Sequence, residues 1–286
     1  MPPGEVETVE SVEAFIAVVE GWRRGWGVNS FNVVGRHEPR YGVFRGHSDH
    51  HWVLKSKIAR MPQLGPGITP YDIEWRTFRA WCHRASRYSP NLCRGGRTID
   101  FNSSASEERW EALACAQHYG VATRLLDWTT EPLHALFFSC TSFLSCPKCS
   151  LDMDGMVWGL NPSLLQIPEL VPNNVPFGDI LNGKPPLFPL TDNVWIYLPP
   201  LNFSDRLRDQ MGCFTVQGKA MMELPDALTE VSHVVRFQGI RKVRIRREMK
   251  SAILCSLKNH YRITFESLFP DLTGLARDIT QEYERE

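Results

Sequence analysis

Hydrophobic residues recur along this chain at two different spacings, and the change from one to the other constrains the fold most. Near the N-terminus, Val12, Phe15 and Val19 follow the period of an amphipathic helix that Ser11 can cap. In residues 242–246, apolar and basic side chains alternate instead, which is the period of a half-buried strand. The mixture predicts an α/β (α+β) protein in which helices flank a sheet.

Similar patterns place the other elements. Strands are predicted at residues 41–45, 123–127, 194–198, 212–217 and 242–246. Helices are predicted around residues 73–81, from a capping box at Ser104 and Glu107 to a stop at Gly120, at residues 133–139, and around residues 253–257. Residues 141–155 and 172–193 have the composition of loops.

The organisation of the 286 residues favours one domain over residues 1–286. No internal repeat and no long linker is visible in the sequence. The predicted elements give a helical N-terminal part over about residues 1–120, a sheet-rich part to about residue 247, and a C-terminal helix.

The charge and apolar patterns limit the compartment and the partners. The 32 basic and 32 acidic residues give a formal net charge of zero, so the whole molecule is not drawn to nucleic acid or to a membrane. The sequence lacks both a signal-peptide pattern and the roughly 20 apolar residues of a membrane span. We therefore expect a cytoplasmic protein with no membrane partner, whose oligomeric state the sequence leaves open.

The cysteines are too sparse for a disulfide scaffold, but three of them lie close together in the sequence. Cys146 and Cys149 form a CxxC pair, with Cys140 nearby. Structural zinc requires four ligands, and no second CxxC pair is visible. Free thiols are the favoured interpretation, and zinc at these cysteines is the less favoured one.

A dense polar cluster follows the first predicted strand. It contains His47, Asp49, His50 and His51. Its favoured interpretation is a solvated turn whose side chains bond the local backbone. The alternative is a metal site, which together with Asp127 would suit a metal-dependent nuclease or hydrolase.

A basic run lies in residues 241–247, with five cations in seven residues. The favoured interpretation is the exposed face of a strand. The alternative is a contact surface for phosphate or nucleic acid, since clustered Lys and Arg displace counterions.

The segment from Gln117 to Thr130 places polar side chains between apolar ones, where a helix, a strand and a second helix follow one another. Asp127, Thr129 and Thr130 precede Pro132 and the second helix, where backbone N–H groups are free to bind an anion. A purely structural alternative is capping together with an internal Arg124–Asp127 pair.

Four stretches of the sequence together resemble the FRG domain family. They are Phe44-Arg45-Gly46 with Trp52 and Leu54, residues 116–138, Arg206 to Phe214, and Ser267 to Leu272. They occur in order over most of the chain, and the second is the longest and most specific. This family resemblance does not itself specify a reaction.

The order of these motifs also resembles, more weakly, an ADP-ribosyltransferase of the arginine–serine–glutamate type. In that comparison Arg45 matches the arginine that holds the NAD phosphates, and Thr129 or Thr130 takes the place of the serine. Gln210 stands where those enzymes carry a catalytic glutamate, so the required negative charge would come from another acid such as Asp127 or Asp209.

The second resemblance implies a split mixed or antiparallel sheet and a cleft that takes NAD, or a related nucleotide, as a substrate. The implied catalytic residues are Arg45, Asp127, Thr129 and Gln210. The implied binding residues are Arg45, Gly46, Gln117, His118, Tyr119, Arg124, Thr130 and Phe138. ADP-ribose would pass to a protein or nucleic-acid acceptor, in a toxin or antiphage-defence role. The alternative is a non-catalytic module that recognises a nucleotide or nucleic acid.

Overall fold

The computed structural model describes most of the chain. The described residues are 6–27, 42–61, 67–85, 87, 106–141, 152–161, 194–197, 205–217, 223–225 and 239–283. Among these residues, no helix has the length and apolar character needed to cross a membrane.

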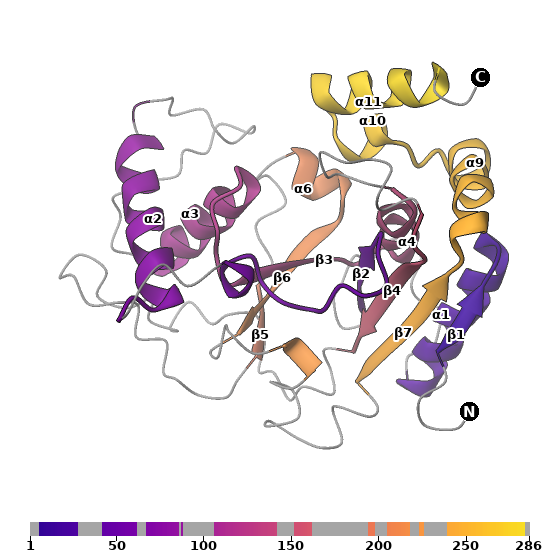
Figure 1. Cartoon of the computed structure of the whole chain (residues 1–286), viewed down its shortest axis with the longest axis horizontal. Coiled ribbons are helices and arrows are strands. Elements are labelled where there is room, and N and C mark those ends of the chain that lie inside the picture. The colour runs from indigo at the N-terminus through magenta and orange to yellow at the C-terminus, as the bar shows by residue number, and fades with distance from the viewer. Residues whose placement is uncertain are drawn as a thin grey trace.

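A seven-stranded sheet forms the centre of the molecule (Figure 1). Its order is β1 (Glu7–Val9), β7 (Ile240–Ile245), β4 (Gly155–Leu160), β2 (Val43–His47), β3 (Leu125–Thr129), β6 (Gly212–Gln217) and β5 (Val194–Tyr197). Neighbouring strands are antiparallel, except that β1 and β7 are parallel. The predicted mixed sheet flanked by helices is confirmed.

The helices form two groups that pack on different parts of this sheet (Figure 1). One group is α2 (Pro70–Ala85) and α3 (Ser106–His118), and the other is α1 (Val12–Gly25), α4 (Pro132–Cys140) and α9 (Lys250–Tyr261), of which α4 packs on the central strand β2. The described residues also form the short helices α6 (Asp205–Asp209) and α10 (Phe265–Leu268) and the longer helix α11 (Leu272–Tyr283). Two 3-10 turns lie at Ile58–Arg60 and Arg247–Met249. Each group of helices covers its own hydrophobic cluster.

Most predicted elements are present at nearly the predicted positions. Ser11 caps α1, and its side-chain oxygen accepts a hydrogen bond from the Ala14 amide at 3.1 Å. Pro132 occupies the first turn of α4, as its fixed φ angle favours. The predicted capping residue Ser104 lies outside the described residues, and α3 begins at Ser106.

Strand β4 was not predicted. Its first residue, Gly155, is the last residue of the loop expected at residues 141–155. This strand lies between β2 and β7, and five of its six residues are buried. A strand buried on both faces lacks the alternation that identifies a half-exposed strand. Its two glycines, Gly155 and Gly159, further resemble loop composition.

The C-terminal part also differs from the prediction. Three helices, α9, α10 and α11, replace the single expected one. A capping box between Thr264 and Ser267 starts α10, so the chain turns sharply after α9. Strands β2 and β3 both end two residues later than predicted.

The sheet opens between β2 and β3. These strands pair at a single position, Phe44 with Thr129. By contrast, β2 pairs with β4 at five positions, and β3 pairs with β6 at five. The two halves of the sheet therefore diverge beyond Phe44.

Candidate functional site

A pocket of about 690 Å³ lies where β2 and β3 separate. Both strands contribute to its wall, with Phe44 to His47 from β2 and Asp127 to Thr129 from β3. The rest of the wall comes from the residues after β2, from α3, α4 and α6, from β6 and the turn before it, and from Thr141 and Phe269. The pocket therefore brings together segments that are distant in sequence.

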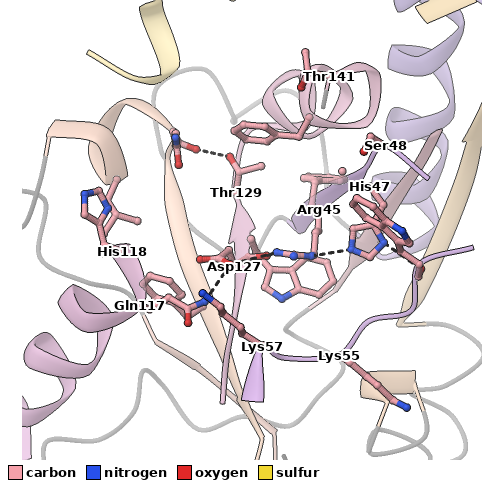
Figure 2. A pocket seen from close by; sticks show the side chains of 18 of the residues that line it. Arg45, His47, Ser48, Lys55, Lys57, Gln117, His118, Asp127, Thr129 and Thr141 are labelled. Carbon is pink, nitrogen blue, oxygen red and sulfur yellow. Dashed lines mark hydrogen bonds and ion pairs between the residues drawn. The ribbon is translucent and has the colours of Figure 1, made fainter. Parts of the chain in front are cut away.

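Arg45 spans the opening between the two strands (Figure 2). Its Nη1 donates to the Asp127 carbonyl oxygen at 2.5 Å and lies 3.5 Å from the Asp127 carboxylate. Its Nε donates to Nε2 of His47 at 3.0 Å. Burial lowers the pKa of Arg45, and the charge of Asp127 opposes that shift. The guanidinium is thus fixed in orientation while its side chain stays 19% exposed.

His47 holds Arg45 in place as a neutral ring. Its Nε2 accepts from Arg45, so its Nδ1 carries the proton and donates to the Trp52 carbonyl oxygen at 3.1 Å. Burial, with Arg45 beside it, lowers the pKa of His47 to about 3. Both ring nitrogens are occupied, which leaves none for the metal site that the nuclease interpretation requires.

Asp127 supplies the negative charge of the pocket. Its side chain is 56% exposed, and its carboxylate accepts from Nε2 of Gln117 at 3.1 Å. Gln117 is fixed in turn, because its carbonyl oxygen accepts from the Thr123 hydroxyl at 2.6 Å. Among the described residues that line the pocket, Asp127 is the one carboxylate.

The suggested Arg124–Asp127 pair is wrong. Arg124 pairs instead with Glu74 of α2 at 2.5 Å, and both side chains are almost completely buried. Arg124 therefore ties β3 to α2 and does not line the pocket. Its predicted role in ligand binding has no support in this geometry.

Five cations and one carboxylate are among the described residues that line the pocket. The cations are Arg45, Lys55, Lys57, Arg60 and Arg206. The zero net charge of the chain conceals this local excess. Sequence reasoning identified only Arg45 among them, although the acid-free run of cations at residues 55–60 was a visible signal.

Arg206 and Lys57 both line the pocket, and each has a contact that orients its charged group. The Arg206 guanidinium lies 4.3 Å from the centre of the Phe269 ring, a cation–π contact that orients it. Nζ of Lys57 donates to the Gly120 carbonyl at the end of α3. Burial, with Arg206 nearby, lowers the pKa of His118 to about 4, so that ring is also neutral near pH 7.

Thr129 and Gln210 line the pocket through a rigid network. The Thr129 hydroxyl donates to the Gln210 carbonyl oxygen at 2.6 Å and accepts from the Glu131 amide at 3.0 Å. The Gln210 side chain donates through Nε2 to the Leu268 carbonyl at 3.0 Å. Gln210 lies in the turn before β6, so this side-chain hydrogen bond connects that turn to α10.

The other predicted binding residues divide into two groups. Gly46, His118 and Phe138 line the pocket. Tyr119 and Thr130 do not: Tyr119 is 56% exposed with its ring 5.0 Å from that of His118, and the Thr130 hydroxyl is buried without a hydrogen-bond partner among the described residues.

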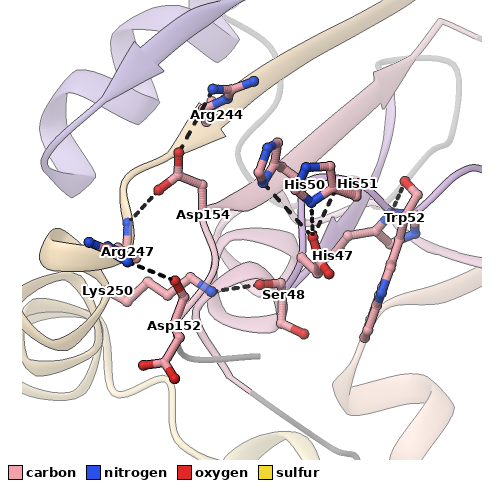
Figure 3. Close-up of polar contacts among 11 residues, drawn as sticks. His47, Ser48, His50, His51, Trp52, Asp152, Asp154, Arg244, Arg247 and Lys250 are labelled. Atoms are coloured by element: carbon pink, nitrogen blue, oxygen red, sulfur yellow. Dashed lines mark hydrogen bonds and ion pairs between the residues drawn. The ribbon is translucent and has the colours of Figure 1, made fainter. Parts of the chain in front are cut away.

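The turn after β2 forms a second polar cluster (Figure 3). Ligand atoms of Asp49, His50 and His51 lie within 4.8 Å of one another, so the three residues have a spacing that could hold a metal. Asp49 also accepts from the His51 amide at 2.9 Å and lies 3.0 Å from its ring Nδ1, as the solvated-turn interpretation predicts. The buried Lys250 ammonium fixes this turn by donating to the Ser48 carbonyl at 2.7 Å.

The cysteine cluster is only partly visible. Cys140 is fully buried in the core, and burial raises the pKa of its thiol to about 12, which disfavours a thiolate ligand there. Cys146 and Cys149 lie outside the described residues.

The basic strand β7 lies away from the pocket, since none of its described residues lines it. Ion pairs with acids engage Arg244 at 3.9 Å, Arg246 at 2.7 Å and Arg247 at 3.0 Å. Lys242 packs over the Trp158 ring at 5.3 Å. This pattern favours the interpretation as an exposed strand face.

Comparison with known families matches the part of the chain that forms most of this pocket. Residues 40–145 match the FRG domain. The FRG match includes β2, α3, β3 and α4, whereas Arg206, Gln210 and Phe269 lie beyond it. No curated protein and no solved structure matches the chain.

Proposed function

We propose that the pocket binds NAD or a related nucleotide and that the protein is an ADP-ribosyltransferase-like enzyme. The observation that carries this proposal is the opening between β2 and β3, spanned by Arg45. A fixed guanidinium suits phosphate oxygens, because it offers paired N–H donors in one plane.

The composition of the pocket supports a ligand that is both anionic and aromatic. Its cations exceed its carboxylates by five to one, which favours phosphate groups. Trp52, His118 and Phe138 add flat rings to the wall. A volume of about 690 Å³ also lies within the range typical of small-molecule sites.

Asp127 is the residue that we propose for the chemical step. When the bond between nicotinamide and ribose C1′ breaks, nicotinamide leaves with the bonding electron pair and positive charge develops on the ribose. A carboxylate beside that ribose stabilises the charge, and the acceptor then bonds to C1′ and loses a proton. Gln210 carries no charge, so we assign it to positioning through Thr129 and Leu268.

The test is nicotinamide release from NAD by the purified protein, with chelator and candidate acceptors present. Asp127→Asn should lower release about 100-fold or more while NAD binding persists. Arg45→Ala should weaken NAD binding itself, by at least about tenfold. Release that is unchanged in both variants would place any NAD chemistry elsewhere.

One observation favours a second candidate, a nucleotide-recognition module without catalysis. The Asp127 carboxylate already engages Arg45 and Gln117, which reduces its availability to a ribose. Arg45-dependent NAD binding with no nicotinamide release under any acceptor condition would support this module over the transferase.

A further inference from the structure

Residues 51–60, which we call the rim segment, lie along one side of the pocket. Three side chains of the segment are buried in the protein: Leu54, Ser56 and Ile58 are 1%, 0% and 0% exposed. The intervening Lys55 and Lys57 instead line the pocket. The alternation anchors the backbone of the segment in the protein and leaves the two lysine side chains in the pocket wall.

The rim segment is a concentrated source of positive charge. It contains Lys55, Lys57 and Arg60 and no carboxylate. Lys55 has an ion pair with Glu223 at 3.5 Å, but both side chains are about one-third exposed and such pairs contribute little. Arg60 lies near enough to Arg45 and His47 to help lower both of their pKa values.

Exposed rings accompany these cations. Trp52 in the rim segment is 37% exposed, and its ring meets His47 edge-on with 6.0 Å between centres. Tyr119 is 56% exposed beside the lining residue His118, and it precedes Gly120, whose carbonyl accepts from Lys57. Large exposed aromatic side chains next to an excess of positive charge are typical of surfaces that bind single-stranded nucleic acid.

We infer that the rim segment binds single-stranded nucleic acid and presents one of its nucleotides to the pocket as the acceptor. The acceptor role rests on the proposed function. Phosphates of the strand meet Lys57 and Arg60, and a base stacks on Trp52. A duplex hides the faces of its bases, so it offers the exposed rings no stacking partner.

The test is binding of a fluorescein-labelled 12-residue oligothymidine to the full chain, by fluorescence anisotropy at about 50 and about 200 mM salt. The K57Q/R60Q double variant should bind at least about tenfold more weakly, and its logarithmic salt slope should fall by about 1.4. The matched control is R241Q/K242Q, which removes two exposed cations from β7 and should bind as the wild type does.

A second variant separates stacking from charge. Trp52→Leu should weaken binding about fivefold or more with an unchanged salt slope. Thermal unfolding of every variant identifies any loss of fold. Any of four outcomes would overturn the inference. Two concern the variants: binding by K57Q/R60Q that is unchanged, or a loss of the same size in the β7 control. The other two concern the ligand: equal affinity for the matched duplex, or equal competition by polyglutamate.

Nicotinamide release and NAD binding, measured on the same preparations, separate the two proposals. If NAD binding and release depend on Arg45 but no oligonucleotide binds, the rim inference fails and the pocket assignment stands. If the oligonucleotide binds through the rim segment but NAD does not bind, the proposed function and the acceptor role fail, and strand binding remains.

Discussion

At the scale of single residues, the site depends on side chains held in one protonation state. His47 can orient Arg45 only while its Nε2 is unprotonated, because that atom accepts from the Arg45 guanidinium. Its pKa of about 3 keeps this arrangement intact at neutral pH.

The low pKa of His47 predicts a loss of stability in acid. An unfolded histidine binds a proton below about pH 6.5, whereas folded His47 binds one only near pH 3. Stability is therefore fully present above about pH 6.5 and falls toward pH 3, by at most ~1.4 kcal/mol per pH unit from this group. Urea unfolding across this range should show a shallower fall in His47→Gln, and equal slopes would contradict the assignment.

The position of Gln210 predicts the effect of restoring a glutamate there. In Gln210→Glu, a carboxylate oxygen would face the Leu268 carbonyl and the present hydrogen bond would be lost. We expect a destabilisation of about 1–3 kcal/mol in urea unfolding and no rise in nicotinamide release. Higher release by the glutamate variant would show that this side chain reaches the reacting bond.

At the scale of elements, β2 lies unusually close to α4. A Cβ atom added at Gly46 would overlap the Ala135 carbonyl oxygen and lie 2.7 Å from the Ser139 amide. The glycine of the Phe-Arg-Gly motif is thus explained by packing, since only a residue without a side chain lets the helix approach the strand.

Gly46→Ala should therefore destabilise the protein strongly, by about 3 kcal/mol or more, because β2 and α4 must separate. Gly25→Ala at the end of α1 is the matched control. An added Cβ there meets nothing within 4 Å, so its unfolding free energy should change by less than about 0.5 kcal/mol. Similar denaturant midpoints for the two variants would rule out the packing explanation.

Local sequence patterns predicted several half-exposed elements and missed the strand that is buried on both faces. The amphipathic face of α1 and the alternation in β7 were both visible in the sequence. The two-sided burial of β4 was not, because burial on both faces is a property of the neighbours of a strand. The partner of Arg124 was missed for a related reason, since Glu74 lies 50 residues away in sequence.

At the scale of the whole molecule, the candidate site is a property of tertiary structure. Motif reasoning placed Arg45, Gln117, Asp127 and Gln210 together, and all four line one pocket. The remaining cations of the wall could not be assigned to it from local sequence, because residues as distant as Lys57 and Arg206 come to line the same pocket only through the fold of the sheet.

The N-terminal strand closes one edge of the sheet. Residues Glu7 to Val9 pair with Val243 to Ile245 of β7, and Val9 is 3% exposed. Deletion of residues 1–10 should cost about 2 kcal/mol from Val9 alone and leave the edge of β7 open to other chains. Thermal unfolding and light scattering should show a lower Tm and association that increases with concentration.

A chain that carries Glu7→Ala and Glu10→Ala but keeps the strand is the control for this deletion. It should unfold close to the wild type, because backbone pairing and Val9 are retained. A deletion variant that stays monomeric with an unchanged Tm would show that β1 is dispensable.

The residues of the pocket wall are spread from Phe44 to Phe269 in the sequence, so the ribosome makes them at different times. Translation delivers the Phe-Arg-Gly strand well before the α6 and α10 walls emerge. A ribosome that stalls anywhere before α10 therefore leaves a product with an incomplete site. The architecture makes ligand binding conditional on translation through α10, so fragments that end before it are expected to be inert.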